Sequence, residues 1–178
     1  MEYKLQIEFI HAIESKLPLL SFLFYRNNLV QGKPFKYGFR IKNIGSTPLI
    51  NATISNITIK SASGQDTQSN LSKTYRTSSI NPDEAKEIWV DRMGTEMHGL
   101  AAVDCSIKSD NSSDTIKTFQ KDEFTKELSE CPSLNYWVDF FFIRSRSEYS
   151  QSNTNILILA LTLLIFLATV LPYLKPLF

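Results

Sequence analysis

Few side chains in this 178-residue chain could perform catalysis. His98, Asp104 and Cys105 together supply a base, an acid and a thiol, which is the set that a cysteine nucleophile requires. Asp104 and Cys105, however, are adjacent in a stretch with the pattern of a β-strand, so their side chains should point to opposite faces. This arrangement is typical of a buried thiol, and we expect no catalytic residues and no enzyme activity.

The sequence lacks the usual patterns of metal ligands and phosphate-binding loops. His11 and His98 have no cysteine or carboxylate at the spacings of ordinary metal sites. There is no glycine-rich phosphate loop and no Gly-x-Ser-x-Gly motif. We therefore expect no metal and no cofactor. Cys105 and Cys131 can pair in an oxidising compartment or remain separate thiols, and the sequence leaves both alternatives open.

Three basic residues alternate along one segment with the pattern of a strand. Lys36, Arg40 and Lys42 share one face of the predicted strand Phe35–Lys42 with Gly38. Most such faces are only solvated, but this one is also the first place to look for an anionic ligand such as a nucleotide or a phosphate lipid. The net charge of +1 argues against nucleic acid as a partner.

A membrane-spanning helix is the strongest prediction from the sequence. Ile156–Leu174 has no charged residue and consists mainly of Ile, Leu, Val, Phe and Ala. At ~1.5 Å per residue the stretch is about 28 Å long, close to the ~30 Å hydrocarbon thickness of a bilayer. Thr162 and Thr169 are seven residues apart and share one helix face, so they could support helix association.

The residues around this helix predict how it meets the aqueous phase. Tyr173 and Lys175 suit the headgroup boundary, and Trp137 is a further candidate for the membrane interface. Arg144–Asn155 is polar and has no apolar periodicity, which predicts a tether. These features divide the chain into a domain at residues 1–143, a tether at 144–155, a transmembrane helix at 156–174 and a short tail at 175–178.

The first 143 residues show the alternation of β-strands rather than the period of helices. Apolar and polar residues alternate in Phe35–Lys42 and Leu49–Lys60, while Asn135–Ile143 carries apolar residues on both faces. The apolar run Leu17–Tyr25 also predicts a strand. Seven or eight strands at roughly ten-residue spacing predict an all-β antiparallel sandwich, followed by one C-terminal transmembrane α-helix.

One segment also resembles a known family. The stretch Phe35-Lys-Tyr-Gly-Phe-Arg-Ile-Lys-Asn-Ile-Gly45 resembles the immunoglobulin-like sandwiches of the CARDB type, in which a strand ending in Asn-x-Gly precedes a second strand, here Leu49–Lys60. A proline-containing turn then leads into a further strand in Asn81–Val90. The resemblance covers residues 35–119. It implies an immunoglobulin-like sandwich that binds or spaces, without implying a chemistry.

The pattern as a whole predicts a tail-anchored membrane protein. The sequence starts without a secretory signal, and Arg144 and Arg146 outnumber Lys175 across the span, which favours a cytoplasmic domain. We expect the sandwich to bind a protein partner or a small ligand, with the lipid bilayer and a second copy as further partners. Two alternatives remain open: a membrane-disrupting effector of the antiphage type, and an extracytoplasmic envelope or adhesion protein.

Overall fold

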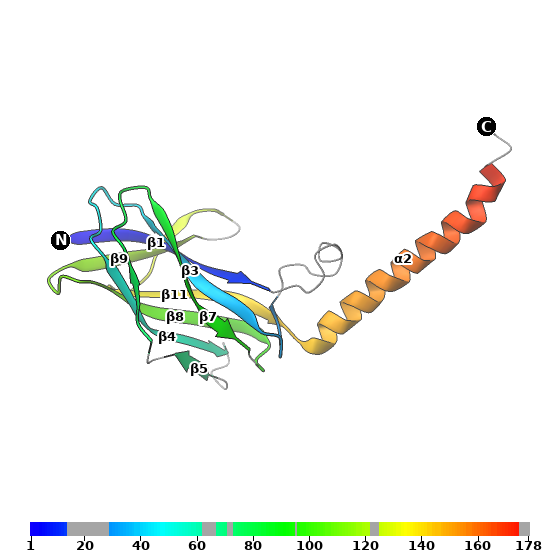
Figure 1. Cartoon of the computed structure of the whole chain (residues 1–178), viewed down its shortest axis with the longest axis horizontal. Coiled ribbons are helices and arrows are strands. Elements are labelled where there is room, and N and C mark those ends of the chain that lie inside the picture. Colours follow the sequence, from blue (N-terminus) through cyan, green and yellow to red (C-terminus); the bar gives the residue numbers. More distant parts are fainter. Residues whose placement is uncertain (14–28, 62–66, 71–72, 95, 122–124, 175–178) are drawn as a thin grey trace.

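Two β-sheets pack face to face, and one long helix leaves from one end of the pair (Figure 1). The structure is a computed structural model that describes residues 1–13, 29–61, 67–70, 73–94, 96–121 and 125–174. The predicted all-β sandwich followed by a C-terminal helix is confirmed. The strand predicted at Leu17–Tyr25 lies outside the described residues.

The first sheet, called sheet A, contains five strands in the order β10-β9-β1-β3-β7. Its central strands β1 and β3 pair antiparallel over eight residue pairs, from Leu5 opposite Asn43 to Ala12 opposite Lys36. The pairing of β1 with β9 is parallel, which departs from the antiparallel prediction. The strands are β1 (Glu2–Ala12), β3 (Phe35–Asn43), β7 (Ala85–Met93), β9 (Thr115–Lys121) and β10 (Leu128–Glu130).

The second sheet, called sheet B, has the order β2-β11-β8-β4-β5, and β6 also pairs with β4. The pairs of β8 with β4 and with β11 are antiparallel, whereas the short β2 runs parallel to the end of β11. The strands are β2 (Leu29–Val30), β4 (Ala52–Ser61), β5 (Thr67–Asn70), β6 (Tyr75–Thr77), β8 (Gly99–Ser109) and β11 (Tyr136–Arg144).

The core lies between the two sheets and is built by the alternation that the sequence shows. Along β3 every second side chain is buried, while Lys36, Arg40 and Lys42 point outward, as predicted. Sheet B contributes the other half of the core from β4, β8 and β11. The largest side chains with almost no exposed surface include Leu5, Ile7, Phe39, Ile41, Ile54, Ile57, Ile59, Ile107 and Trp137.

Asn43 fixes the predicted turn that follows β3. Its side chain is fully buried and its Nδ2 donates to the carbonyl oxygens of Thr47 (2.9 Å) and Ile80 (3.0 Å). Its Oδ1 accepts a hydrogen bond from the backbone N–H of Gly45 at 3.0 Å. This is the local bonding by which asparagine stabilises turns, and it explains why the strand ends in Asn-Ile-Gly.

Helix α2 (Arg146–Leu174) begins ten residues earlier than predicted. The Glu148 carboxylate accepts from the backbone N–H of Ser145 (3.1 Å), and the Ser145 hydroxyl accepts from the backbone N–H of Glu148 (3.2 Å). This reciprocal pair is a capping box, which satisfies backbone donors that a helix start leaves open. The prediction of a tether is therefore wrong from Arg146 onward, because Ser-Arg-Ser-Glu148 starts a helix that the polar segment continues.

Candidate functional site

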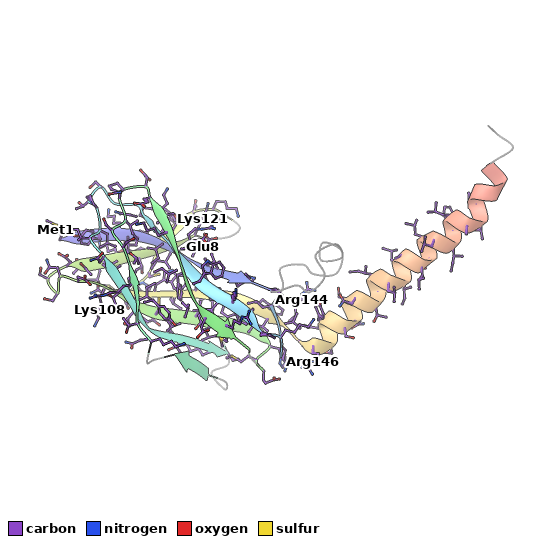
Figure 2. The ribbon with its side chains drawn as sticks, viewed as in Figure 1. Met1, Glu8, Lys108, Lys121, Arg144 and Arg146 are labelled. Carbon is purple, nitrogen blue, oxygen red and sulfur yellow. The ribbon has the colours of Figure 1, made fainter. Side chains whose placement is uncertain are left out.

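The N-terminal end of α2 is hydrogen-bonded to the turn that follows β2. The backbone N–H of Gln31 donates to the carbonyl of Arg144 (2.9 Å), and the side-chain oxygen of Gln31 accepts from the backbone N–H of Arg146 (3.4 Å). The side-chain nitrogen of Gln31 donates to the carbonyl of Glu96 at 2.7 Å. One glutamine thus joins the end of β11, the start of α2 and the segment before β8. Figure 2 shows Arg144 and Arg146 on either side of this junction.

Two further contacts hold the helix against the same turn. The Nζ of Lys33 lies 4.0 Å from the centroid of the Tyr149 ring, which is the geometry of a cation–π contact. Gly32 has a φ of +71°, and a Cβ placed there would lie 2.5 Å from Nη2 of Arg146. Glycine adopts this left-handed backbone without strain. These contacts join the first turn of α2 to the sandwich.

The three predicted basic residues share one face of β3, and Arg40 and Lys42 form ion pairs with acidic residues. Arg40 donates to Glu87 at 2.7 Å and to Glu8 at 3.2 Å, and its hydrogen bond to Glu87 is the main cause that raises the pKa of its guanidinium. Lys42 forms an ion pair with Asp83 at 3.3 Å. These exposed ion pairs neutralise the positive charges of Arg40 and Lys42. Lys36, the third basic residue of this face, lines a groove.

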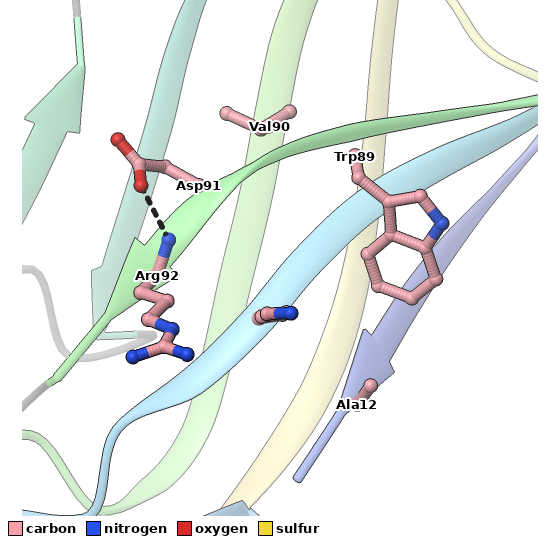
Figure 3. Close-up of a pocket in the computed structure, with 6 residues that line it drawn as sticks. Ala12, Trp89, Val90, Asp91 and Arg92 are labelled. Atoms are coloured by element: carbon pink, nitrogen blue, oxygen red, sulfur yellow. Dashed lines mark hydrogen bonds between the residues drawn. The ribbon is translucent and has the colours of Figure 1, made fainter. Parts of the chain in front are cut away.

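That groove, of about 710 Å³, lies on the outer face of sheet A, at the end of β7. Register places Arg92 directly opposite Lys36 and Trp89 directly opposite Gly38, so their side chains share the outer face. Ala12 of β1 is the neighbour of Lys36 on the other side. Figure 3 shows Ala12, Trp89 and Arg92 around the groove. We call this set the cationic groove.

A β-bulge creates the cationic groove. The register of β3 with β7 shifts between Tyr37 and Gly38, and Val90 has no opposite residue on β3. In an unbroken strand Trp89 and Arg92 would face opposite sides, but the extra residue brings both outward. Simple alternation therefore missed Trp89 and Arg92. The glycine in the middle of a strand, Gly38, was the signal that could have indicated a bulge.

The acidic residue beside the groove is already paired. Lys73 donates to the carboxylate of Asp91 at 2.5 Å, and this hydrogen bond is the main cause that lowers the pKa of Asp91. The backbone N–H of Arg92 also donates to Asp91 at 2.7 Å. The charge of Arg92 lowers the pKa of Asp91 further, so the lining of the groove contains charges of both signs that interact with each other.

The prediction of Trp137 at the membrane interface is wrong. Its indole is fully buried between the sheets, and its ring meets Phe39 edge to face, with the centroids 5.7 Å apart. The odd-numbered residues of β11 at this point face the core, since Trp137 and Ile143 are both buried. The side chain of Tyr173 and the whole of Lys175 lie outside the described part of the chain.

The outward face of β11 instead carries exposed aromatic residues. Phe140 and Phe142 are 57% and 56% exposed, and Leu100, directly opposite Phe142 on β8, is 50% exposed. These three residues form one surface, which we call the aromatic patch. It lies on the last part of β11, and Ser145 alone separates that strand from α2.

Helix α2 is long and apolar enough to cross a membrane. Its segment Arg146–Val170 has a mean hydropathy of 2.1 in its most apolar window, and none of that window is buried against the sandwich. The hydroxyls of Thr162 and Thr169 donate to the carbonyls of Ile158 (2.8 Å) and Ile165 (2.9 Å) in the same helix. Any role of the two threonines in helix association therefore rests on packing of their side chains.

Cys105 and Cys131 are both buried and are not joined by a disulfide. Burial raises the pKa of the Cys105 thiol well above its usual range, so the reactive thiolate is disfavoured. Asp104 points to the other face of β8, as predicted, and forms an ion pair with Lys60 at 3.1 Å. Among the residues that the structure describes, no group of three or more His, Cys, Asp or Glu side chains could hold a metal ion.

The fold and the helix define a β-sandwich protein with one segment that could span a membrane. No protein-family model matches the chain, and no curated protein matches it. Two solved structures of a CARDB domain from Pyrococcus furiosus are similar, and this is the type that the Phe35–Gly45 pattern resembles. The solution NMR structure has a TM-score of 0.42 and 15% identity, covering 81% of this chain and 98% of that domain. The crystal structure, described as a complex with di-metal ions, has a TM-score of 0.41 and 12% identity, with 81% and 94% covered.

Proposed function

We propose that this chain is a single-pass membrane protein whose sandwich is an interaction module, and that its partner is a second copy of the chain in the same membrane. The observation that carries this proposal is the aromatic patch of Leu100, Phe140 and Phe142 on the strand that leads into α2. Contiguous exposed apolar surface of this kind marks interaction sites on soluble domains.

The size of the aromatic patch suits the centre of an interface. From their exposed fractions, the three side chains present roughly 300 Å² of apolar surface. A stable protein interface buries about 800 Å² on each partner, with aromatic residues enriched at its core. The patch would therefore supply the apolar centre, and the polar surface around it and the neighbouring helix would supply the rest.

The junction favours a second copy over other partners. Gln31 bonds to both Arg144 and Arg146, so each copy in a membrane would carry its patch close to the start of its α2 helix. Two such copies can meet around a two-fold axis that runs along the membrane normal, with the same surface used on both sides. The exposed apolar faces of their α2 helices then lie side by side and can pack through Thr162 and Thr169.

Self-association can be tested with the full chain in lipid vesicles. We expect fluorescently tagged protein to bleach in two steps, and Phe142→Asp to weaken dimerisation at least about tenfold, because a buried carboxylate at an interface centre is costly. The matched control is Ile50→Asp, since Ile50 is 71% exposed and lies beside Leu49, outside the patch. Single-step bleaching of the unmodified chain at all protein densities would exclude a dimer, and equal weakening by Ile50→Asp would exclude the patch.

We place the sandwich on the cytoplasmic side of the membrane. Arg144 and Arg146 stand at the start of α2 on the side of the sandwich, and positive residues beside a span favour the cytoplasm. We expect Lys108→Cys, at an exposed position of β8, to escape labelling by a membrane-impermeant maleimide in intact cells and to react after lysis. Labelling in intact cells would place the sandwich outside and support the envelope alternative.

A further inference from the structure

We propose that two copies of α2 pair in parallel along a polar seam of Asn155, Thr162 and Thr169, in which the side-chain amides of the two Asn155 residues bond to each other. This inference rests on the self-association proposed above, and it names the helix surface and the residue that fix the pairing. The three residues follow one another at intervals of seven in α2. Within the apolar run Ile156–Val170 the two threonines are the only polar side chains.

The interval of seven favours a pair of helices that stay in contact along the seam. Residues seven apart complete almost two turns, so they return to the same helix face with a drift of about 20°. A left-handed supercoil of two helices removes this drift. Ile158 and Ile165, each three residues after a member of the seam, lie on the same face and are 56% and 65% exposed. They would supply the apolar flank of the contact.

The hydrogen bonds of the seam distinguish Asn155 from the two threonines. The hydroxyls of Thr162 and Thr169 already donate to carbonyls of their own helix. The side chain of Asn155 is exposed and makes no hydrogen bond within the described part of the chain. It directly precedes the apolar run, where water becomes scarce, and an amide at such a position gains from a partner on another helix.

A second copy is the partner that this arrangement suits. An amide carries both a donor and an acceptor, so two Asn155 side chains related by a two-fold axis can each donate to the other. Copies inserted with one topology have parallel helices, so equivalent residues meet. The area also calls for the helix, because the aromatic patch presents roughly 300 Å² of the about 800 Å² that each partner buries in a stable interface. None of the apolar window of α2 is buried against the sandwich.

Glu148 lies on the same face as the seam, and a parallel pair would bring two of its carboxylates toward each other. It is seven residues before Asn155, ~10 Å away along the helix, in the polar part of α2. Water and salt screen the repulsion between exposed charges of this kind. We therefore expect the contact between the two helices to run from Asn155 into the apolar segment.

Disulfide cross-linking of the full chain in lipid vesicles tests which helix face is in contact. With copper phenanthroline and oxygen as the oxidant, Thr162→Cys should form covalent dimers at least about tenfold faster than Leu164→Cys, since residues two apart differ by about 200° around a helix. The unmodified chain gives the background, because Cys105 and Cys131 are buried.

The role of the amide is tested by stepwise bleaching at a series of protein densities. Asn155→Leu should weaken dimerisation about threefold to tenfold, which is the contribution of a hydrogen bond between helices in lipid. The matched control is Asn153→Leu, which removes the same amide from nearly the opposite face of α2 and should change dimerisation less than about twofold.

The outcomes separate this proposal from the one on which it rests. Two-step bleaching of the unmodified chain, with faster cross-linking of Leu164→Cys than of Thr162→Cys, would overturn the seam and leave self-association standing. An effect of Asn155→Leu no larger than that of Asn153→Leu would overturn the bond between the two amides. Single-step bleaching at all protein densities would overturn both proposals.

Discussion

Trp137→Ala is expected to lower the free energy of unfolding of the sandwich by about 4 kcal/mol, because it opens a cavity between the two sheets. Trp137 is the largest fully buried side chain, and its edge-to-face contact with Phe39 joins sheet B to sheet A. Urea unfolding of the full chain in detergent, followed by the fluorescence of Trp89, gives the midpoint from which the change is obtained. At the membrane interface the same substitution would change the unfolding of the sandwich very little.

Trp137→Phe is the matched control for this cavity. The indole Nε1 is buried and has no hydrogen-bond partner among the described residues, so phenylalanine removes an unsatisfied donor as well as some volume. The two effects oppose each other, so we expect the free energy of unfolding to fall by about 1 kcal/mol or less. A loss with Trp137→Phe as large as that with Trp137→Ala would show that the indole volume is not what stabilises the contact between the sheets.

The two sheets could be predicted because local alternation is enough to define buried and exposed faces. Along Phe35–Asn43 the apolar positions are all buried, and the turn residue Asn43 is where its bonding to Gly45 requires it. The apolar length of α2 likewise depends only on composition. The order of the strands could not be predicted, because pairs such as β1 with β9 join segments more than a hundred residues apart.

The alternation pattern of β11 does not show which of its two faces is buried in the core. Trp137 and Phe141 alternate with Phe140 and Phe142, so both faces are apolar and the period alone cannot choose between them. In the structure the indole enters the core and two phenylalanines remain exposed. The aromatic patch results from this choice, which only the packing against Phe39 reveals.

The candidate ligand site was predicted in part. Lys36 was correctly placed on an outward face, but the acidic partners of Arg40 come from β1 and β7, which a single segment does not reveal. Trp89 and Arg92 were missed because the bulge changes the alternation of β7. The start of α2 at Arg146 was missed for a different reason, since its capping box lies in a segment without apolar periodicity.

Gly38→Ala is expected to destabilise the sandwich by about 3 kcal/mol. A Cβ at Gly38 would lie 2.3 Å from the carbonyl oxygen of Ile88, which is a backbone atom and cannot rotate away. The strands β3 and β7 would have to separate at the bulge, which would move Trp89 away from the row of Lys36 and Arg92. Urea unfolding of the full chain in detergent measures this loss of stability.

Gly94→Ala is the matched control, because, apart from the two chain neighbours of Gly94, no described residue has an atom within 4 Å of a Cβ placed there, and its backbone is outside the left-handed region. That variant should keep the stability of the unmodified chain to within about 0.5 kcal/mol, since surface substitutions rarely change it more. Wild-type stability of Gly38→Ala would show that the strands do not approach closely at the bulge. In that case Trp89 and Arg92 would not be held on one face, and the cationic groove would lose its structural basis.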